Sequence, residues 1–222
     1  MPIRRLLLAA VCSLGLACAH AQDAARRPPA NGWNVGAIAL VRDGGYIGDV
    51  NRTLVGPAVG YEGDHVFFRG LQLGGHAWQR EGMQLDVVAQ ARLDGFDRDD
   101  IPIPGLEDRR ESVDLGAVMT LSGDAGKLEF IALTDALNRS GGQELALEYG
   151  YPFMLGRVRI TPKAGVRWWS RDLADYYYGI RPREVAQGAP AADAVSSSLL
   201  PELGVNVMAP VNRRWGLWGA AR

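Results

Sequence analysis

Nine charged residues could form a network of ion pairs, because they alternate with other residues in the manner of one strand face. They are Asp86, Arg92, Asp114, Glu144, Glu148, Arg157, Arg159, Lys163 and Arg167. Opposite charges that face each other across antiparallel strands contribute roughly 0.2–1 kcal/mol each. A tight turn at Phe153-Met154 would place Glu148 opposite Arg159. The same register would place Glu144 opposite Lys163. We therefore predict electrostatic cross-linking of neighbouring strands, and the alternative is that these side chains are simply hydrated.

Hydrolytic chemistry has few candidate residues. It needs a nucleophile, a base and an orienting group. Beyond the first 21 residues the histidines are His65 and His76, and the serines considered as nucleophiles are Ser140 and Ser170. Neither serine stands in a recognisable nucleophile elbow, and each histidine is predicted to lie in a turn or at a rim. We therefore predict that the chain is not an enzyme; a hydrolase would need a histidine beside a serine in a concave site.

Metal and phosphate binding have little support in the sequence. One acidic segment offers carboxylate oxygens for a divalent cation, but it lacks the spacing of a calcium-binding loop. Its members are Asp94, Asp97, Asp99 and Asp100. A solvated acidic loop is predicted instead. Gly44-Gly45 and Gly141-Gly142 are predicted to be turn glycines, because no helix follows them to bind phosphate. No metal and no cofactor are therefore predicted.

The first 21 residues are predicted to be a secretory signal. The apolar run over residues 6–19 is shorter than the ~20 residues that a spanning helix needs. Ala19-His20-Ala21 is a small-x-small cleavage site, so the mature chain would begin at Gln22. The alternative is lipidation at Cys18. Residues 22–32 are polar and contain prolines, and they are predicted to be a short periplasmic lead-in.

Composition excludes several classes of protein. Both cysteines, Cys12 and Cys18, lie in the signal, so the exported chain has no disulfide framework. Without Arg4 and Arg5 the chain has 22 basic and 25 acidic residues, which is not the footprint of a nucleic-acid-binding protein. No later apolar run predicts a transmembrane helix. The 28 glycines and 12 prolines punctuate short segments, which favours an all-β chain.

Alternation of apolar and polar residues predicts long β-strands. The clearest alternation occurs at 84–93, 112–121, 144–151 and 157–168, and weaker strands are predicted at 33–41, 127–135, 199–208 and from Trp215. A soluble sandwich or a lipocalin-like barrel would also fit. An outer-membrane barrel is favoured by the strand lengths, the unbroken apolar faces and the aromatic residues at strand ends, which suit interfacial girdles. These aromatic residues are Trp78, Tyr149, Tyr151, Trp168, Trp169, Tyr176, Tyr177, Tyr178 and Trp215.

The connections between strands predict the topology. The long ones are 42–56, 94–111 and 170–197. They share one side, as in outer-membrane barrels, if 57–79 is one long strand bent at Glu62-Gly63-Asp64. The count is then nine strands, of which the ninth is incomplete. Because single-chain bacterial barrels have an even count, we predict an all-β, antiparallel, up-and-down transmembrane barrel over 33–222, with about ten strands when complete and the last one missing here.

The interior of such a barrel has little free space. Side chains already fill an eight-stranded barrel. The nine charged residues lie on the polar faces of their strands, so they are predicted to cross the lumen. This arrangement favours a plugged barrel over a wide pore.

Several segments resemble a known family. Tyr176, Tyr177, Tyr178 and Gly179, within residues 175–184, are similar to the Tyr-Tyr-Tyr-Gly block of the MipA/OmpV family of outer-membrane proteins. Shorter segments agree with other patterns of that family, namely 46–49, 57–61, 93–96 and 105–110. The resemblance runs from about Trp33 to the C-terminus, where the family continues through further strand.

The resemblance implies an outer-membrane location, contact with lipid and no catalytic residues. It also implies a scaffold that joins a murein transglycosylase to a peptidoglycan synthase. Other members are described as porin-like, adhesive or immunogenic, so a small-solute channel and a surface adhesin are the alternatives. The tyrosine run is expected to form an interfacial belt, with a partner-binding patch as the alternative.

Overall fold

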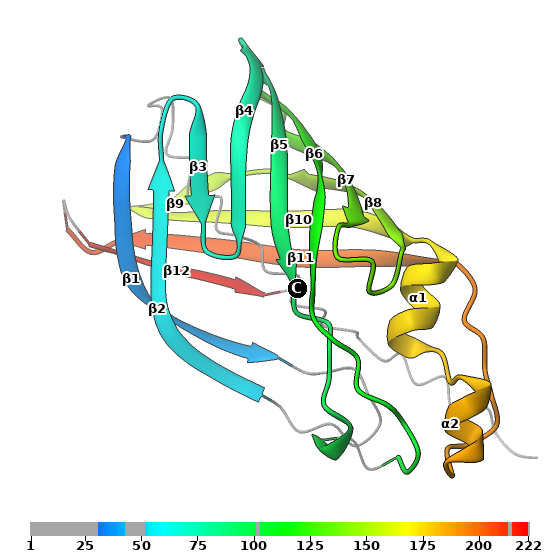
Figure 1. Cartoon of the computed structure of the whole chain (residues 1–222). Coiled ribbons are helices and arrows are strands. Elements are labelled where there is room, and N and C mark those ends of the chain that lie inside the picture. The colour runs from blue at the N-terminus through cyan, green and yellow to red at the C-terminus, as the bar shows by residue number, and fades with distance from the viewer. Residues whose placement is uncertain (1–30, 43–51, 101–102, 213–214, 222) are drawn as a thin grey trace, which may run out of the picture.

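A computed structural model describes residues 31–42, 52–100, 103–212 and 215–221 (Figure 1). The predicted signal, both cysteines and all but the last two residues of the predicted lead-in lie outside these ranges. So do Gly44-Gly45 and the family-like segment 46–49 in the first long connection. Those expectations stay predictions.

The described chain forms one antiparallel sheet, as the alternation predicts. Neighbours along the chain are neighbours in the sheet, in the order β1-β2-β3-β4-β5-β6-β7-β8-β10-β11-β12, and β9 also pairs with β10. The strands are β1 (Gly32–Arg42), β2 (Arg52–Glu62), β3 (Val66–Arg69), β4 (Gln72–Arg80), β5 (Met83–Arg92), β6 (Ser112–Gly123), β7 (Gly126–Asp135), β8 (Gln143–Gly150), β9 (Phe153–Leu155), β10 (Val158–Trp169), β11 (Ser198–Pro210) and β12 (Gly216–Ala221). The prediction of an all-β, up-and-down sheet is confirmed. The sheet curls, but among the described residues β1 does not pair with β12 (Figure 1).

The predicted count of nine strands is wrong because segment 57–79 is not one bent strand. It belongs to three strands, β2, β3 and β4, separated by turns after Glu62 and after Arg69. Gly70 stands in the second turn with φ of 63°, a left-handed conformation that glycine adopts without steric cost. Three is still an odd number, so strands β1, β5 and β10 run in the same direction and terminate at the same end of the antiparallel sheet. We call this the helix end and the opposite one the turn end.

The predicted register between β8 and β10 is also wrong. Glu148 lies opposite Gly165 and Glu144 opposite Trp169. The chain reverses at Gly156-Arg157, where Gly156 has φ of 63°, and not at Phe153-Met154. Pro152, which has no N–H donor, interrupts the strand between β8 and β9 without turning it.

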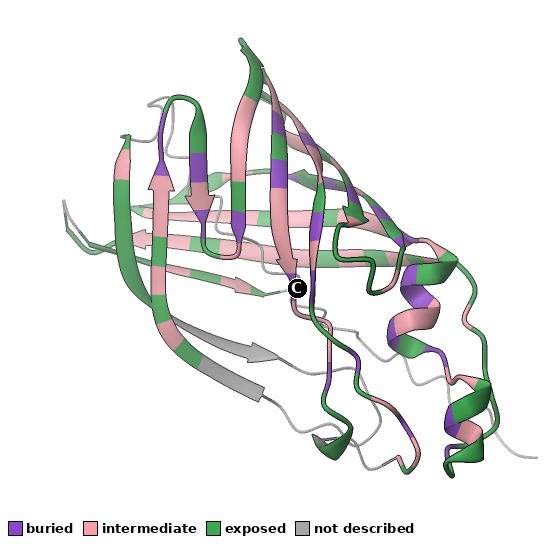
Figure 2. Ribbon diagram, in the orientation of Figure 1, coloured by how far each residue is buried: buried purple, intermediate pink, exposed green. Residues whose placement is uncertain are grey.

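Burial on the sheet is inverted relative to a soluble protein (Figure 2). Large apolar side chains are exposed on the outer face: Val87 is 57% exposed, Leu145 51% and Leu203 78%. The inner face buries charged groups together with one small apolar cluster. This cluster consists of Phe67, Val88, Val118 and Leu133. An apolar exterior around a polar interior is typical of strands that meet lipid.

The connection 170–197 contains two helices that the period-two pattern did not predict, α1 (Arg171–Tyr178) and α2 (Pro182–Ala186). Their local signals are present in the sequence. The Ser170 hydroxyl caps α1 by accepting a hydrogen bond from the backbone N–H of Leu173, and Pro182 occupies the first turn of α2. No helix in the described part of the chain is long and apolar enough to cross a membrane.

Candidate functional site

The centre of the inner face, near the helix end, is a buried carboxylate that three side chains contact. Glu144 on β8 is 2% exposed. It accepts hydrogen bonds from Nη2 of Arg92 at 2.7 Å and from Nε1 of Trp169 at 3.0 Å. Arg167 on β10 pairs with its other oxygen. Removing one member of such a buried set would leave an uncompensated charge. We therefore infer that the contacts around Glu144 hold β5, β8 and β10 together.

Two further carboxylates extend this set across the sheet. Nε of Arg92 donates to Asp114 on β6 at 2.7 Å, and Nε of Arg167 donates to Glu202 on β11 at 2.9 Å. We call Arg92, Asp114, Glu144, Arg167 and Glu202 the central network. It spans five strands, and every carboxylate in it contacts a guanidinium. Such fixed pairing suits mechanical cross-linking better than proton transfer.

Helix α1 lies next to the central network. Leu173, Ala174 and Tyr177 face inward and pack with Trp169, a residue of β10 that is only 3% exposed. The Arg92 guanidinium lies 5.7 Å from the centre of the Trp169 ring, within the range of a cation–π contact. Burial raises the pKa of Tyr177, so its hydroxyl stays protonated, and it donates a hydrogen bond to the carbonyl of Arg110 at 3.3 Å.

A second buried ion pair joins the two long connections at the helix end. Nη1 of Arg109, from connection 93–111, lies 2.6 Å from Oε1 of Glu184 on α2, and the two side chains are 1% and 0% exposed. Arg109 also donates to the Gly179 carbonyl at 3.0 Å. The backbone N–H groups of Arg181 and Glu107 donate to the Glu184 carboxylate at 2.7 and 2.9 Å. We call this pair the loop clasp.

The electrostatics of the loop clasp favour the ionised carboxylate. Burial by itself would raise the pKa of Glu184. The hydrogen bonds from Arg109 and from two backbone N–H groups outweigh burial and hold the pKa at about 2. Sequence reasoning missed both residues as a site. Their signal was available, because Arg109 and Glu184 each stand in a segment that carries the family resemblance.

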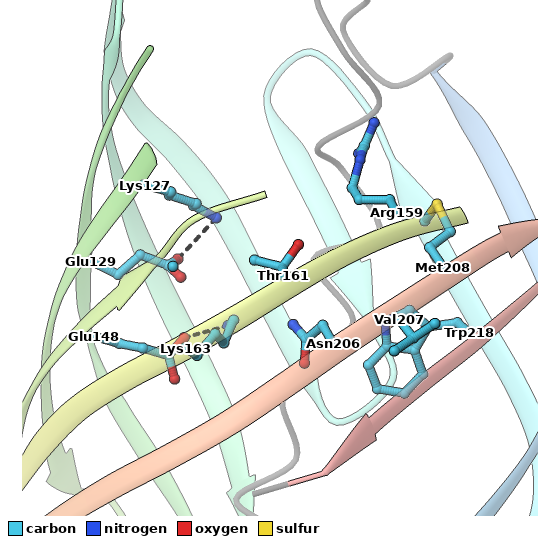
Figure 3. A pocket seen from close by; sticks show the side chains of 11 residues that line it. Lys127, Glu129, Glu148, Arg159, Thr161, Lys163, Asn206, Val207, Met208 and Trp218 are labelled. Atoms are coloured by element: carbon cyan, nitrogen blue, oxygen red, sulfur yellow. Dashed lines mark hydrogen bonds and ion pairs between the residues drawn. The ribbon is translucent and has the colours of Figure 1, made fainter. Parts of the chain in front are cut away.

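A different charged cluster lies at the turn end of the inner face. Glu129 on β7 and Glu148 on β8 are directly opposite each other. Lys127 lies 3.1 Å from Glu129, and Lys163 pairs with Glu148. These contacts offset the repulsion that two facing carboxylates would otherwise produce. The cluster borders a small pocket (Figure 3).

A third cluster surrounds a buried histidine on β4. Nδ1 of His76 lies 2.7 Å from Asp86, and its Nε2 lies 3.3 Å from Glu62. Arg69 pairs with the same Glu62 at 2.9 Å. The prediction that His76 sits in a turn or at a rim is therefore wrong, because its side chain is only 5% exposed on the inner face.

The structure thus brings together part of the predicted charged set. Arg92, Asp114, Glu144 and Arg167 share one network, and Glu148 pairs with Lys163 instead of Arg159. Asp86 belongs to the histidine cluster. Arg157 is exposed in the turn before β10, and Arg159 lines the pocket in Figure 3. That the whole set forms a lumen network stays a proposal.

The expected interfacial belt of tyrosines is not what the structure shows. Tyr177 is 1% exposed and belongs to the core beneath the helix end, as does Trp169. Tyr178 is 37% exposed and stacks with Trp169 at a ring-centre distance of 5.8 Å. Helical geometry explains the difference, because one turn of helix sends successive side chains in different directions.

The catalytic and metal candidates have ordinary surroundings. His65 is exposed in the turn between β2 and β3. Ser140 donates to the Asp135 carboxylate at 3.1 Å, and Ser170 caps α1. Asp94, from the acidic connection, pairs with Arg92 at 2.9 Å. Within the described ranges, no group of three or more His, Cys, Asp or Glu could hold a metal ion.

Comparison with known proteins gives a consistent result. The model of the family described as MltA-interacting protein MipA matches residues 35–222. The putative outer membrane protein YiaT of Escherichia coli (strain K12) is 27% identical over 192 residues, which cover 85% of this chain and 78% of that protein. The MltA-interacting protein of the same strain is 27% identical over 169 residues, which cover 75% and 68%.

A relative that matches over a shorter stretch, and the solved structures, complete the comparison. The outer membrane protein OmpV of Vibrio cholerae is 27% identical over 113 residues, which cover 51% of this chain and 44% of that protein. No solved structure matches the chain. The family match spans most of the sequence, YiaT and OmpV are named as outer membrane proteins, and the sheet exposes large apolar side chains on its outer face. The chain therefore belongs to the MltA-interacting protein MipA family of outer-membrane proteins.

Proposed function

We propose that this protein is a non-enzymatic scaffold of the outer membrane that binds the machinery of peptidoglycan synthesis. Its partners in this proposal are a murein transglycosylase and a peptidoglycan synthase, and its apolar outer face contacts membrane lipid. The observation that carries the proposal is the set of paired charges on the inner face of the sheet. The central network cross-links five strands, and α1 packs beside it through Trp169.

The central network makes conduction of solutes the weaker alternative. A channel needs a continuous hydrated path, and the wide lumen of porins is built from 16–18 strands. In the part of the chain that the structure describes, eleven strands follow one another around the sheet, and side chains on its inner face form ion pairs between strands. The loop clasp then ties the connection after β5 to α2 at the helix end. Both features support a protein that binds partners at its surface instead of conducting solutes through its interior.

The name of one relative supports the proposal that this protein binds a protein partner. That relative is the MltA-interacting protein of Escherichia coli, and the match covers 68% of its length. Short turns connect the strands at the turn end, including those after β4 and β6. Outer-membrane barrels keep short turns on the periplasmic side, where the murein layer lies. The turn end is therefore the surface that we propose for the partner.

Co-purification tests this proposal. The full chain, tagged at its C-terminus, is isolated from detergent-solubilised outer membranes, and the bound fraction is probed for murein transglycosylase and peptidoglycan synthase. We expect both enzymes to be retained with the wild type. Their absence, in a preparation whose heat-modifiable gel mobility shows folded protein, would contradict the scaffold role. Retention of the transglycosylase alone would restrict the role to a single partner.

A further inference from the structure

A pocket at the turn end of the inner face is separate from the central network. It is formed by β7, β8, β10, β11 and β12, and its volume is about 30 Å³ for water-sized molecules. Thr161 on β10 and Asn206 on β11 lie directly opposite each other and line it. Figure 3 shows both side chains between the lysine–glutamate pairs and Arg159. The small pocket therefore presents hydrogen-bond donors beside two carboxylates that lysines already contact.

The charges around this pocket do not balance. Lys127 contacts Glu129 and Lys163 contacts Glu148, so each of these carboxylates already has a cation. Arg159 is the fifth charged group of the lining. Its Nη1 atom is buried and has no hydrogen-bond partner among the described residues. A buried donor on a guanidinium without a partner is costly, because its lost hydration is not replaced.

We propose that the pocket binds a small oxyanion, a carboxylate or phosphate group, through Arg159. A guanidinium presents N–H donors in a fork that matches both kinds of oxyanion. Thr161 and Asn206 line the same pocket, so their hydroxyl and amide groups are further donors available to the ligand. The indole of Trp218 on β12 supplies an apolar wall. The bound oxyanion supplies the negative charge that Arg159 lacks.

The size of the pocket limits the ligand. A drug-sized ligand occupies a pocket of several hundred cubic ångströms, whereas this one admits about two water-sized molecules. The ligand is therefore a small anion, or the anionic end of a longer molecule that enters from the turn end. This site would function whether or not the protein is a peptidoglycan scaffold, because none of its residues belongs to the central network or the loop clasp.

Thermal unfolding of the full chain in detergent tests the proposal. Sodium chloride is replaced stepwise by sodium acetate or sodium phosphate at constant ionic strength and pH. A ligand that binds only the folded state raises the unfolding midpoint as its concentration exceeds Kd. We expect such a rise for the wild type and for Arg157→Gln, a matched control two residues away in the exposed turn. We expect Arg159→Gln to weaken the apparent affinity at least about tenfold.

The responses to acetate and to phosphate distinguish the two kinds of ligand. A response to acetate alone identifies a carboxylate site, and a response to phosphate alone identifies a phosphate site. No response in the wild type, or an equal response in Arg159→Gln, would overturn the proposal. Thr161→Val, which preserves side-chain shape, is the second variant. It provides the test if Arg159→Gln does not fold. We expect Thr161→Val to lower the apparent affinity for the anion several-fold, and an unchanged affinity would count against the site.

Discussion

Breaking the loop clasp with Glu184→Gln should loosen the helix end without unfolding the sheet. The carboxylate pKa is about 2 in the folded protein, against an ordinary value of 4.5. This difference corresponds to about 3 kcal/mol of stabilisation at neutral pH. Because the folded-state pKa is the lower one, the contribution is complete above about pH 4.5 and is lost as the pH falls toward 2. Arg109, which is 2% exposed, would keep its buried charge without the carboxylate.

Hydrogen exchange measures this effect locally. We expect amides in 103–110 and 180–189 to exchange up to about 100-fold faster in Glu184→Gln at pH 7, since each 1.4 kcal/mol is tenfold. In the wild type, protection of the same amides, corrected for intrinsic rates, should decline between pH 4.5 and 2. The variant should show no such step.

A matched control is available in the same two connections. Glu107 pairs with Arg181 at 3.4 Å and Arg183 at 2.5 Å, but its side chain is 29% exposed. Solvent screens such a pair, so Glu107→Gln should change protection by less than about 1 kcal/mol. Equal protection in wild type and Glu184→Gln, or a protection step between pH 6 and 7, would refute the reasoning.

Three further predictions concern the sheet. Glu144→Gln removes the shared partner of Arg92 and Arg167, so the free energy of unfolding in urea should fall by about 3–5 kcal/mol; a loss below 1 kcal/mol would mean that the central network contributes little. Lys163→Met leaves Glu148 facing Glu129 without the lysine that pairs with it, and should lower the free energy of unfolding in urea through repulsion between the facing carboxylates; an unchanged value would mean that Lys163 does not offset this repulsion. Leu203→Arg places a charge on the exposed outer face, and should reduce folding into lipid vesicles by about 2–4 kcal/mol if it lies near the bilayer midplane; normal insertion would argue against lipid contact there.

The faces of the strands could be predicted because alternation is a local property. In 84–93 and 112–121 the residues assigned to the polar face include Asp86 and Asp114, and both are buried on the inner face. Period two requires no knowledge of neighbouring strands. The antiparallel order followed from short connections, since a strand and its successor pair when only a tight turn separates them.

Register could not be predicted reliably, because it depends on which irregularity turns the chain. Pro152 and Gly156 both stand between β8 and β10, and only the glycine reverses direction. Placing the turn at Phe153-Met154 shifted the expected partners of Glu148 and Glu144. The same difficulty affected 57–79, where Gly70 makes a turn that looked like the interior of a long strand.

The site at the helix end was beyond sequence reasoning for a different reason. Arg109 and Glu184 are separated by 75 residues, and their contact depends on how two connections fold over the sheet. The helices themselves carried local signals, namely a serine cap at Ser170 and Pro182 at the start of α2. A strict period-two interpretation ignored those signals. The Tyr176–Tyr178 run was then placed at a membrane interface instead of in a helix.

We propose that paired charges on the inner face of this outer-membrane protein block the conduction of solutes. Planar-bilayer conductance of the purified full chain tests it most directly, with heat-modifiable gel mobility as the check that the inserted protein is folded. We predict no steady conductance from the wild type, and openings once Arg92, Glu144 and Arg167 are replaced together by smaller neutral residues. Stable, ohmic conductance steps from the folded wild type would contradict the account and favour a small-solute channel.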